Sequence, residues 1–421
     1  MKKLWSSLVV SVLSVALLAG CGSSGSGSAG GSGSSGGSGG KKVQLELFSN
    51  KSESIETYKE LIKEFESKNP NITVKLEAPP EAETVLKTRL TKNNLPDIIS
   101  MGATSTYREL ARAGVLMDFS NYDKLNTIQP AYVKMIGKVV GSDKKGVYGI
   151  PYATNANGVI YNKTKFEKLG FKVPQTWDEF MNELKKAKQA GEIPIYFTLK
   201  DPWTAMVTWN SLAANLAPDN FAEMKSNGKA SFQEDYKDVA SKFLDLLKYG
   251  HKDNFGVGYG DGNKAFANGK GVFYLQGNWA IPEIKKANPD VKLGMFAFPA
   301  SNDASKNRLV SGVDVLLTIT KSTKHKEEAQ KFIDFMLTKE TAQKYTDEQA
   351  AFSAVKGVFQ KDQSFTDIKK NFEQGTIVGF PDHFYPAGFQ AANLVQEFLI
   401  KKNEQKFLKK MDTTWDKVLQ R

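Results

Sequence analysis

The sequence contains very little cysteine and histidine. Cys21 is the single cysteine among 421 residues, and the three histidines are His251, His325 and His383. A lone cysteine cannot form an intrachain disulfide, and neither a cysteine cluster nor the H-E-x-x-H spacing of a zinc site is present. These absences exclude a disulfide scaffold, and we predict that the chain uses no metal and no cofactor.

The residues around Cys21 suggest a different role for the cysteine. Residues 1–20 carry Lys2 and Lys3 after the initial methionine, continue as an apolar run and end in small residues, which is the layout of a signal peptide. Cys21 ends the motif LAGC, which resembles the bacterial lipobox. That resemblance implies cleavage of the chain before Cys21 and a lipid on the cysteine sulfur. A retained N-terminal anchor helix is the alternative. We predict a lipid-anchored protein on the extracellular face of a cell membrane of the Gram-positive type.

A tether follows the predicted lipidation site. Residues 22–40 consist of glycine, serine and one alanine, so they have no side chain that could join a hydrophobic core. Such a tract behaves as a flexible coil with a root-mean-square reach of roughly 25 Å. The globular part therefore begins at residue 41.

Charge gives little support for a nucleic-acid partner. Lysine and arginine number 57 against 46 aspartate and glutamate residues, and the formal net charge is +11. The lysines alternate with acids, as in KELIKEFESK and KHKEEAQK, which is typical of solvated helix faces. We predict that the protein binds no nucleic acid and is a monomer.

Hydrophobic periodicity predicts an α/β protein of more than one domain. VQLELF, ITVKLEA and LPDIIS read as strands separated by helical segments, which favours a mostly parallel sheet covered by helices. A second α/β unit begins near GVIYNK. Its first long helix follows a capping box at Thr176 and Glu179, and IPIYFTL, GVFYL and KLGMFAF continue it as strands. Ser311 to Thr320 reads as a long crossing strand, followed by an amphipathic helical region from KHKEEAQK to ETAQKY.

Aromatic residues in polar loops are the candidate binding residues. Trp203 stands in DPWTAMVTWN, Trp279 in QGNWA, and Phe380 in GFPDHFYPAGF. Aromatic rings can lie against the apolar faces of sugars, and neighbouring polar side chains can bind hydroxyls. A single tryptophan is more often part of a core, but Trp203 and Phe380 stand beside proline and polar residues outside any regular apolar period.

Two other chemistries were weighed. The glycine-rich segment 256–271 fits neither G-x-G-x-x-G nor the P-loop spacing, so these glycines favour a loop before a helix. Paired carboxylates of a glycoside hydrolase stay possible because separation in space cannot be read from sequence.

Several segments together resemble the family 1 extracellular solute-binding proteins, the receptors of carbohydrate ABC importers. The matching segments, in family order, are LPDIIS, LARAGVLMDFS, GVYGIPYATNANGVIYNKTKFEKLGFKVPQTWDEF, NKAFANGKGVFYLQGNWAIPEIKK, LGMFAFP and GVDVLLTITKSTKHKEEAQKFIDFM. The resemblance covers nearly all of the chain beyond the tether. It implies binding without catalysis and a partnership with ABC transporter permease subunits.

The resemblance also implies a two-lobe, periplasmic-binding-protein-like (type II) α/β fold with a hinge and an interlobe cleft. The implied crossovers are GIPYATNANG, the segment from Arg308 to Asp314, and the segment from Ser353 to Val358. The N-terminal lobe would comprise residues 41–152 and 312–354. The C-terminal lobe would comprise residues 153–311 and 355–421.

Family ligand positions carry over to loops and strand ends of this sequence. The implied substrate-binding residues are Lys51, Glu53, Gly102, Thr104, Asn155, Asn157, Trp203, Gln276, Trp279, Asp314, Phe380, Asp382 and His383. FPDHFYPAG looks most like receptors of the multiple-sugar and raffinose type, which implies that Asp382 and His383 hold a terminal sugar while Phe380 stacks on it. The implied ligand is an α-1,6-linked galactoside or glucoside such as raffinose, melibiose, stachyose or an isomalto-oligosaccharide. The alternatives are a surface-anchored glycoside hydrolase, and a peptide or metal receptor on the same fold.

Overall fold

The structure is a computed structural model that describes residues 42–141, 143–386 and 388–420. The predicted signal peptide, the lipidation site Cys21 and the tether lie outside the described residues. The anchor therefore stays a prediction from the sequence.

One mixed sheet runs through the described residues. Its strands are β1 (Val43–Ser49), β2 (Ile72–Glu77), β3 (Ile98–Met101), β4 (Ile150–Asn162), β5 (Phe273–Gly277), β6 (Leu293–Phe296), β7 (Leu309–Ile319), β8 (Phe352–Ser353) and β9 (Ile377–Val378). The order is β2-β1-β3-β7-β4-β5, with β6 and β8 paired to β4 and β9 paired to β7.

The prediction of a mostly parallel sheet came from the first three strands, and for these strands it is confirmed. β1 pairs with β2 and β3 in parallel, because a helix connects each strand to the next. β7 then runs antiparallel to β3 and to β4, and β4 runs antiparallel to β5 and β6. β7 comes from far along the chain, and a local strand–helix pattern does not show with which strands, or in which direction, such a segment pairs.

Helices cover this sheet in two groups. The first group is α1 (Ile55–Lys68), α2 (Ala82–Thr91), α3 (Ser105–Arg112), α4 (Pro130–Val140), α13 (Lys326–Met336) and α14 (Lys339–Glu348). The second group is α5 (Lys163–Leu169), α6 (Trp177–Gln189), α7 (Pro202–Leu216), α8 (Phe221–Ser226), α9 (Phe232–Asp235), α10 (Lys237–Leu247), α11 (Tyr259–Ala267), α12 (Ala280–Ala287), α15 (Thr366–Glu373), α16 (Ala391–Lys401) and α17 (Glu404–Leu419). Short 3₁₀ helices include η1 (Ser52–Ser54), η2 (Asp123–Thr127), η3 (Ala304–Lys306), η4 (Gln363–Phe365) and η5 (Pro381–Phe384).

Separate hydrophobic cores lie under the two groups of helices. The first core draws its buried residues from 45–153 and 313–358. The second draws from 159–300 and 385–415, and a third, smaller core joins β4 and β5 to α11, α12 and α15. We call the part around the first core the N-terminal lobe and the part around the other two the C-terminal lobe. The lobe bounds predicted from sequence stay a prediction, because Lys41–Arg421 forms one compact unit.

Local sequence explains how the first core forms. Leu45 and Leu47 alternate along β1 and are fully buried, as the period of a strand requires. Tyr58, Ile62 and Phe65 lie on one face of α1, and Phe65 packs edge-on against Phe332 of α13 at 5.1 Å. Burying a side chain of this size contributes roughly 1.5–3 kcal/mol, so this amphipathic face fixes α1 on the sheet.

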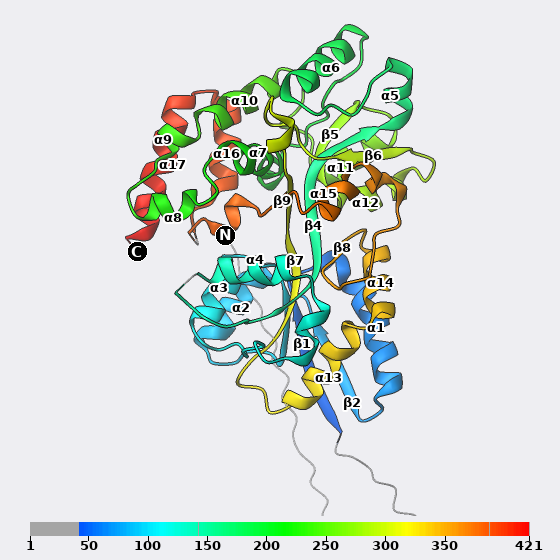
Figure 1. The fold of residues 1–421 in the computed structure, drawn as a ribbon, viewed down its shortest axis with the longest axis vertical. Helices are drawn as coiled ribbons and strands as arrows, with labels where there is room; N and C mark the ends of the chain where they lie inside the picture. Colours follow the sequence, from blue (N-terminus) through cyan, green and yellow to red (C-terminus); the bar gives the residue numbers. More distant parts are fainter. Residues whose placement is uncertain (1–41, 142, 387, 421) are drawn as a thin grey trace, which may run out of the picture. The chain divides into compact units, whose positions relative to one another are not determined.

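Two strands pass through both lobes. β4 pairs with β7 from Ile150–Leu317 to Asn157–Val310, and Figure 1 shows both strands running from one lobe into the other. The predicted first crossover and the strand GVIYNK are thus parts of one strand of 13 residues. The polar middle of β4 is thereby held between the lobes.

Two local predictions need correction and one is confirmed. IPIYFTL contributes a single parallel bridge, Ile195 with Phe273, in place of a strand. The helical region after residue 325 is divided into α13 and α14, because Thr338 caps α14 by accepting a hydrogen bond from the Thr341 amide. The cap at Thr176 is confirmed, since Thr176 accepts from the Glu179 amide at 3.3 Å, whereas the Glu179 carboxylate accepts from the Gln175 amide, one residue before the predicted donor.

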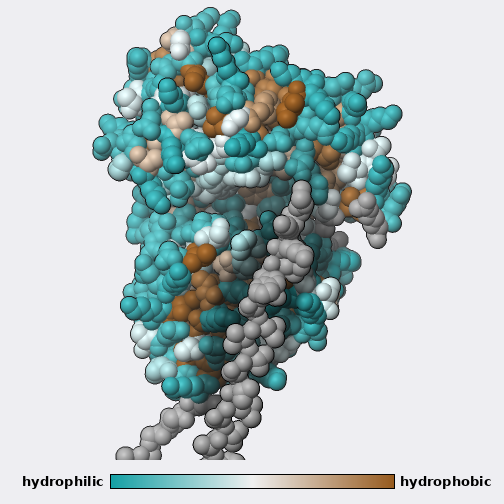
Figure 2. All heavy atoms as spheres, turned by 180° about the vertical axis from the view of Figure 1, so that it is seen from behind, coloured by the Kyte–Doolittle hydropathy of each residue, from teal (hydrophilic) through white to brown (hydrophobic). Residues whose placement is uncertain are grey.

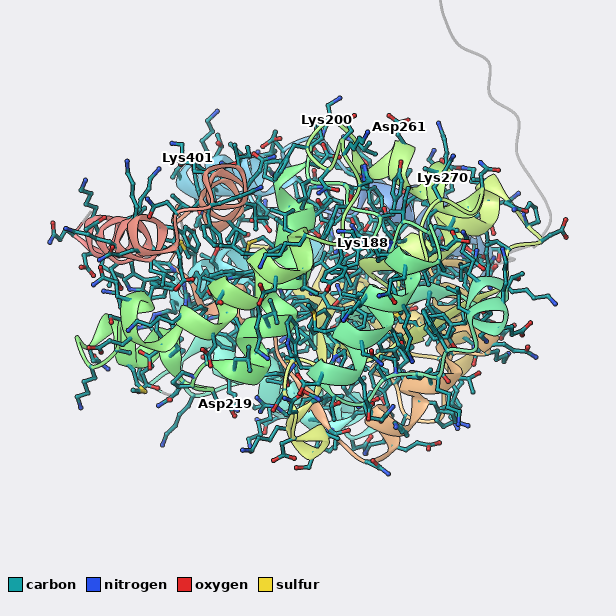
Figure 3. All side chains as sticks on the ribbon, turned by 90° about the horizontal axis from the view of Figure 1, so that it is seen from above. Lys188, Lys200, Asp219, Asp261, Lys270 and Lys401 are labelled. Atoms are coloured by element: carbon teal, nitrogen blue, oxygen red, sulfur yellow. The ribbon has the colours of Figure 1, made fainter. Side chains whose placement is uncertain are left out.

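Charged and apolar side chains are spread over the surface. In the view of Figure 3 the labelled Lys188, Lys200, Lys270 and Lys401 lie apart from one another, and Asp261 lies between two of them. The face in Figure 2 is mostly hydrophilic, with small hydrophobic groups. None of the helices in the described ranges has the length and apolar character to cross a membrane.

Candidate functional site

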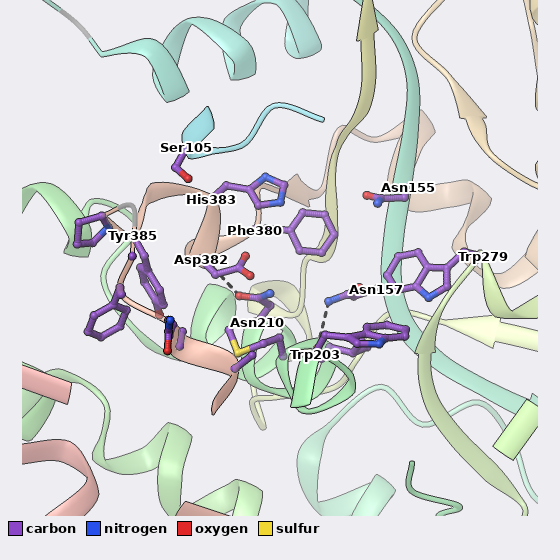
Figure 4. Close-up of a pocket in the computed structure, with 18 residues that line it drawn as sticks. Ser105, Asn155, Asn157, Trp203, Asn210, Trp279, Phe380, Asp382, His383 and Tyr385 are labelled. Carbon is purple, nitrogen blue, oxygen red and sulfur yellow. Dashed lines mark hydrogen bonds between the residues drawn. The ribbon is translucent and has the colours of Figure 1, made fainter. Parts of the chain in front are cut away.

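A cavity of about 450 Å³ opens beside the polar middle of β4. β4, α3, α7, the turn before α12, η5 and the segment leading into α16 contribute its walls (Figure 4). The residues that line it are Ser105, Asn155, Asn157, Trp203, Met206, Val207, Asn210, Trp279, Phe380, Asp382, His383, Tyr385, Pro386, Gly388, Phe389, Gln390, Ala391 and Ala392. Seven of the predicted site residues are among them.

Asn155 and Asn157 reach the cavity from one face of β4, because they are two residues apart on the strand. The Asn155 side-chain amide donates to Asp314 Oδ1 at 2.9 Å, and that of Asn157 donates to the Val207 carbonyl at 3.1 Å. These bonds orient both amides. The Oδ1 atom of each asparagine is buried and has no hydrogen-bond partner among the described residues.

Trp203 lies in the first turn of α7, one residue after Pro202 at the helix N-terminus. Its side chain is 41 % exposed, whereas Trp209 of the same helix is fully buried. The Trp203 ring packs at 4.9 Å against Tyr259 and at 6.5 Å against Trp279. An exposed indole braced by two other rings offers a flat apolar surface to a ligand.

Trp279 depends on a glycine behind it. A Cβ built on Gly277 would lie 2.1 Å from the Trp279 ring, so the ring can rest on the end of β5 only where residue 277 has no side chain. The indole Nε1 of Trp279 is buried and lacks a hydrogen-bond partner in the described part of the chain.

The segment 380–386 forms the opposite wall. Phe380 and His383 stack at a centroid distance of 5.0 Å and an interplanar angle of 28°. The Asp382 amide donates to Asn210 Oδ1 at 3.3 Å, and Asp382 Oδ1 is buried with no partner in the described ranges. Burial lowers the pKa of His383, although the carboxylates of Asp382 and Asp314 oppose this shift. The imidazole is therefore neutral at physiological pH and can both donate and accept a hydrogen bond.

A second glycine positions this stack. A Cβ on Gly312 of β7 would lie 2.5 Å from the Phe380 ring. We expect Gly312→Ala to displace Phe380 and His383, and to weaken ligand binding by about tenfold, ~1.4 kcal/mol. Titration calorimetry with the sugars named below measures this loss.

Gly137→Ala is the matched control for that substitution. Gly137 lies in α4, where an added Cβ meets nothing within 4 Å, so binding should stay unchanged. Equal affinities of Gly312→Ala and the unmodified protein would contradict the role given to the Phe380–His383 stack.

Lys51 and Asp314 stand behind the cavity wall. Lys51 Nζ lies 2.5 Å from Asp314 Oδ1, the same oxygen that accepts from Asn155. Burial alone lowers the pKa of Lys51, but Asp314 and Glu53 more than offset it and raise the pKa above its ordinary value. Lys51 is thus charged, and the shared acceptor Asp314 fixes the orientation of the Asn155 amide.

The remaining predicted residues lie outside the lining. Glu53 is exposed, and the Thr104 hydroxyl donates to Glu83 at 3.2 Å. A Cβ on Gly102 would lie 3.3 Å from the Asp314 carbonyl. Gln276 is buried, and its amide donates to Thr198 Oγ1 at 3.4 Å while Oε1 has no partner in the described ranges.

Sequence reasoning missed Ser105 and Asn210, and it left Tyr385 out of the implied site although Tyr385 lies in the aromatic segment GFPDHFYPAGF. A signal for Asn210 existed, because Trp203, Met206, Val207 and Asn210 follow the helical spacing of one face of α7. Ser105 and Tyr385 are brought to the cavity by different lobes, and no local pattern relates them.

Asp382 is the single carboxylate among the described lining residues. Glycoside hydrolysis ordinarily needs two carboxylates facing each other across the bond. Likewise, the described residues contain no group of three metal-ligating side chains. The arrangement provides hydrogen-bond donors and acceptors beside aromatic surfaces, which suits binding of a polar, ring-shaped molecule.

Comparison with known proteins gives the family. Residues 50–343 match the family described as bacterial extracellular solute-binding protein. The chain belongs to this family. Proteins of this family bind solutes for transporters and are not enzymes, so this chain is a solute-binding protein and the hydrolase alternative is excluded.

Individual relatives agree with the family. The chain is 34 % identical over 354 residues to the multiple sugar-binding protein of Streptococcus mutans, covering 82 % of this chain and 81 % of the relative. The structure of the solute-binding protein RafE in complex with raffinose aligns with a TM-score of 0.78 at 27 % identity, over 90 % of this chain and 100 % of the other. Ligand-free RafE from Streptococcus pneumoniae aligns with a TM-score of 0.77 at 27 % identity, over 90 % and 98 %. These likenesses confirm the predicted two-lobe solute-binding fold.

Proposed function

We propose that the protein captures an oligosaccharide in the cavity between its lobes and delivers it to an ABC importer. The observation that carries this proposal is the set of buried polar atoms around one cavity that lack partners in the described residues. They are Asn155 Oδ1, Asn157 Oδ1, Trp279 Nε1 and Asp382 Oδ1. Each such atom costs about 1–3 kcal/mol while unsatisfied, and sugar hydroxyls can both donate to the oxygens and accept from the indole.

The aromatic residues support a ligand with apolar ring faces. Trp203 lies on one side of the cavity and the Phe380–His383 stack on another, with Asn157 between them in Figure 4. An oligosaccharide matches this arrangement, because each of its sugar rings has an apolar face and an edge of hydroxyl groups. We propose an α-1,6-linked galactoside or glucoside of the raffinose and melibiose type, a class suggested by the segment around Asp382 and by the names of the relatives.

We further propose that Cys21 carries a lipid and that the tether leaves the binding lobes free beside the permease subunits at the extracellular face of the membrane. Ligand binding would shift the population of the protein from open towards closed lobes, and the permease would bind the closed form. Mass spectrometry of the intact protein isolated from membranes tests the anchor. A diacylglyceryl mass at the N-terminal cysteine is expected, and a chain that retains residues 1–20 would contradict it.

Titration calorimetry with a sugar panel tests the proposed ligand. We expect raffinose and melibiose to bind with dissociation constants in the micromolar range, about −8 kcal/mol, and maltotriose to bind at least tenfold more weakly. The discrimination follows because a differently linked sugar leaves buried polar groups without partners. Panose contains an α-1,6 bond between two glucoses and no galactose. Its affinity therefore shows whether the protein recognises the linkage or the galactose. Failure of all four sugars to bind below millimolar concentration would contradict the proposal.

A further inference from the structure

The loop 380–386 contacts both lobes through successive residues. Phe384 packs against the core of the N-terminal lobe. Tyr385, the next residue, is buried in the main core of the C-terminal lobe. A displacement of one lobe relative to the other therefore acts directly on the segment that carries Asp382 and His383.

Tyr385 is firmly held in the C-terminal lobe. Its ring packs at 5.4 Å against both Phe389 and Trp415, and its hydroxyl accepts from Trp209 Nε1 at 3.3 Å. The hydroxyl also shares a hydrogen bond of 3.2 Å with Tyr236. Tyr385 thus provides a fixed point on this side of the cavity.

Arg108 reaches this fixed point from the other lobe. Arg108 lies on α3, whose buried residues belong to the core of the N-terminal lobe, and its Nη2 donates to the Tyr385 carbonyl at 3.3 Å. In the described part of the chain no carboxylate forms an ion pair with Arg108, whereas Arg112, one turn later, is paired with Asp143 at 2.8 Å. The guanidinium of Arg108 is thus directed to a backbone carbonyl of the opposite lobe.

The same end of α3 faces the ligand cavity. Ser105 lines the cavity, and Figure 4 shows it on the opposite side of His383 from Trp203. Contacts from α3 to the loop 380–386 are therefore adjacent to the binding residues. Separation of the lobes at this point must break the Arg108–Tyr385 hydrogen bond and expose Phe384.

We propose that Arg108 and Phe384 form a clasp between the lobes, which positions the Asp382–His383 loop and slows the release of bound ligand. Both act as positioning residues, since neither lines the cavity. The release-rate part of this inference rests on the proposed function, whereas the positioning part does not depend on which ligand is bound.

Hydrogen–deuterium exchange of the ligand-free protein tests the positioning. The loop contains protected amides, because the His383 amide donates to the Phe380 carbonyl and the Tyr385 amide to the Asp382 carbonyl. We expect Arg108→Ala and Phe384→Ala to speed exchange in the peptide 380–389 by about fivefold or more, while peptides of β1 and α17 stay unchanged. Arg108→Lys, which keeps a donor, should restore part of the protection.

Two matched controls use residues that lack the cross-lobe contact. Arg112→Ala removes an arginine from the same helix, and Phe359→Ala removes a phenylalanine that is 68 % exposed. Neither should alter exchange in the peptide 380–389. Unchanged exchange in both clasp variants, or faster exchange throughout the chain, would overturn the proposal. If an alanine variant does not fold, the same exchange measurement is made on Arg108→Lys and Phe384→Leu.

Stopped-flow measurement with raffinose tests the effect on release. We expect the clasp variants to raise the dissociation rate about threefold to tenfold and to leave the association rate unchanged, the usual division for residues that hold a formed complex. An unchanged dissociation rate would overturn the clasp. If the unmodified protein does not bind raffinose, the proposed ligand fails, and the exchange experiment still decides the positioning.

Discussion

Asp382→Ala is expected to lower the affinity for oligosaccharide by roughly ten- to hundredfold, because a hydrogen bond to a charged group contributes about 1.5–3 kcal/mol. Asp382 Oδ1 is buried beside the cavity with no partner among the described residues. A sugar hydroxyl would supply the donor that the folded chain does not. Titration calorimetry with raffinose measures the change.

The stability of the ligand-free protein should behave differently from the affinity. The Asp382 carboxylate makes no side-chain hydrogen bond that its removal would break in the described ranges, so the melting temperature should stay within a few degrees of the unmodified value. Asp290→Ala, at an exposed position outside the lining, is the control and should change neither quantity. A large loss of stability without a loss of affinity would show that Asp382 supports the fold and does not contact the ligand.

Trp203→Ala should weaken binding by about tenfold or more, ~1.4 kcal/mol, since apolar burial contributes roughly 25 cal/mol per Å² and a sugar face on the indole would bury on the order of 60 Å². The ring is 41 % exposed in the ligand-free structure and braced by Tyr259 and Trp279. Its removal takes away an apolar surface without opening a hole in the core. Calorimetry gives the affinity, and a thermal melt of the same sample gives the stability.

Phe359→Ala serves as the comparison for Trp203→Ala, because Phe359 is an exposed aromatic residue outside the cavity lining. Its removal should leave the affinity unchanged. Should Trp203→Ala unfold the protein, or bind raffinose as tightly as the parent, the indole would not be the surface on which a sugar rests.

The sequence was sufficient to predict most elements of the fold. Strict alternation identified β1 and β2, and the capping residues at Thr176 and Glu179 located the start of α6. Strand direction could not be predicted in the same way, because β7 pairs with β3 and β4 from more than 150 residues away. The prediction of a strand at IPIYFTL failed for a related reason: the segment forms only a single bridge with β5, at Ile195, and local propensity does not reveal how long a pairing will be.

Predicted site residues that are close in sequence also lie together in the structure, and their role in binding stays a prediction. Asn155 with Asn157, and Phe380 with Asp382 and His383, are neighbours in the chain and lie together on the cavity. Gln276 lies on β5 outside the lining and donates to Thr198, whereas Trp279, beyond the end of that strand, lines the cavity. The position of Ser105 on the cavity depends on how the two lobes pack against each other, and no local sequence pattern predicts that packing.

A crystal structure of the protein grown with saturating raffinose tests the central claim most directly. The account predicts one sugar ring against Trp203, another near the Phe380–His383 stack, and hydroxyls hydrogen-bonded to Asn157 Oδ1 and Asp382 Oδ1. Sugar density elsewhere on the molecule, or a sugar in the cavity that leaves these oxygens without partners, would contradict it.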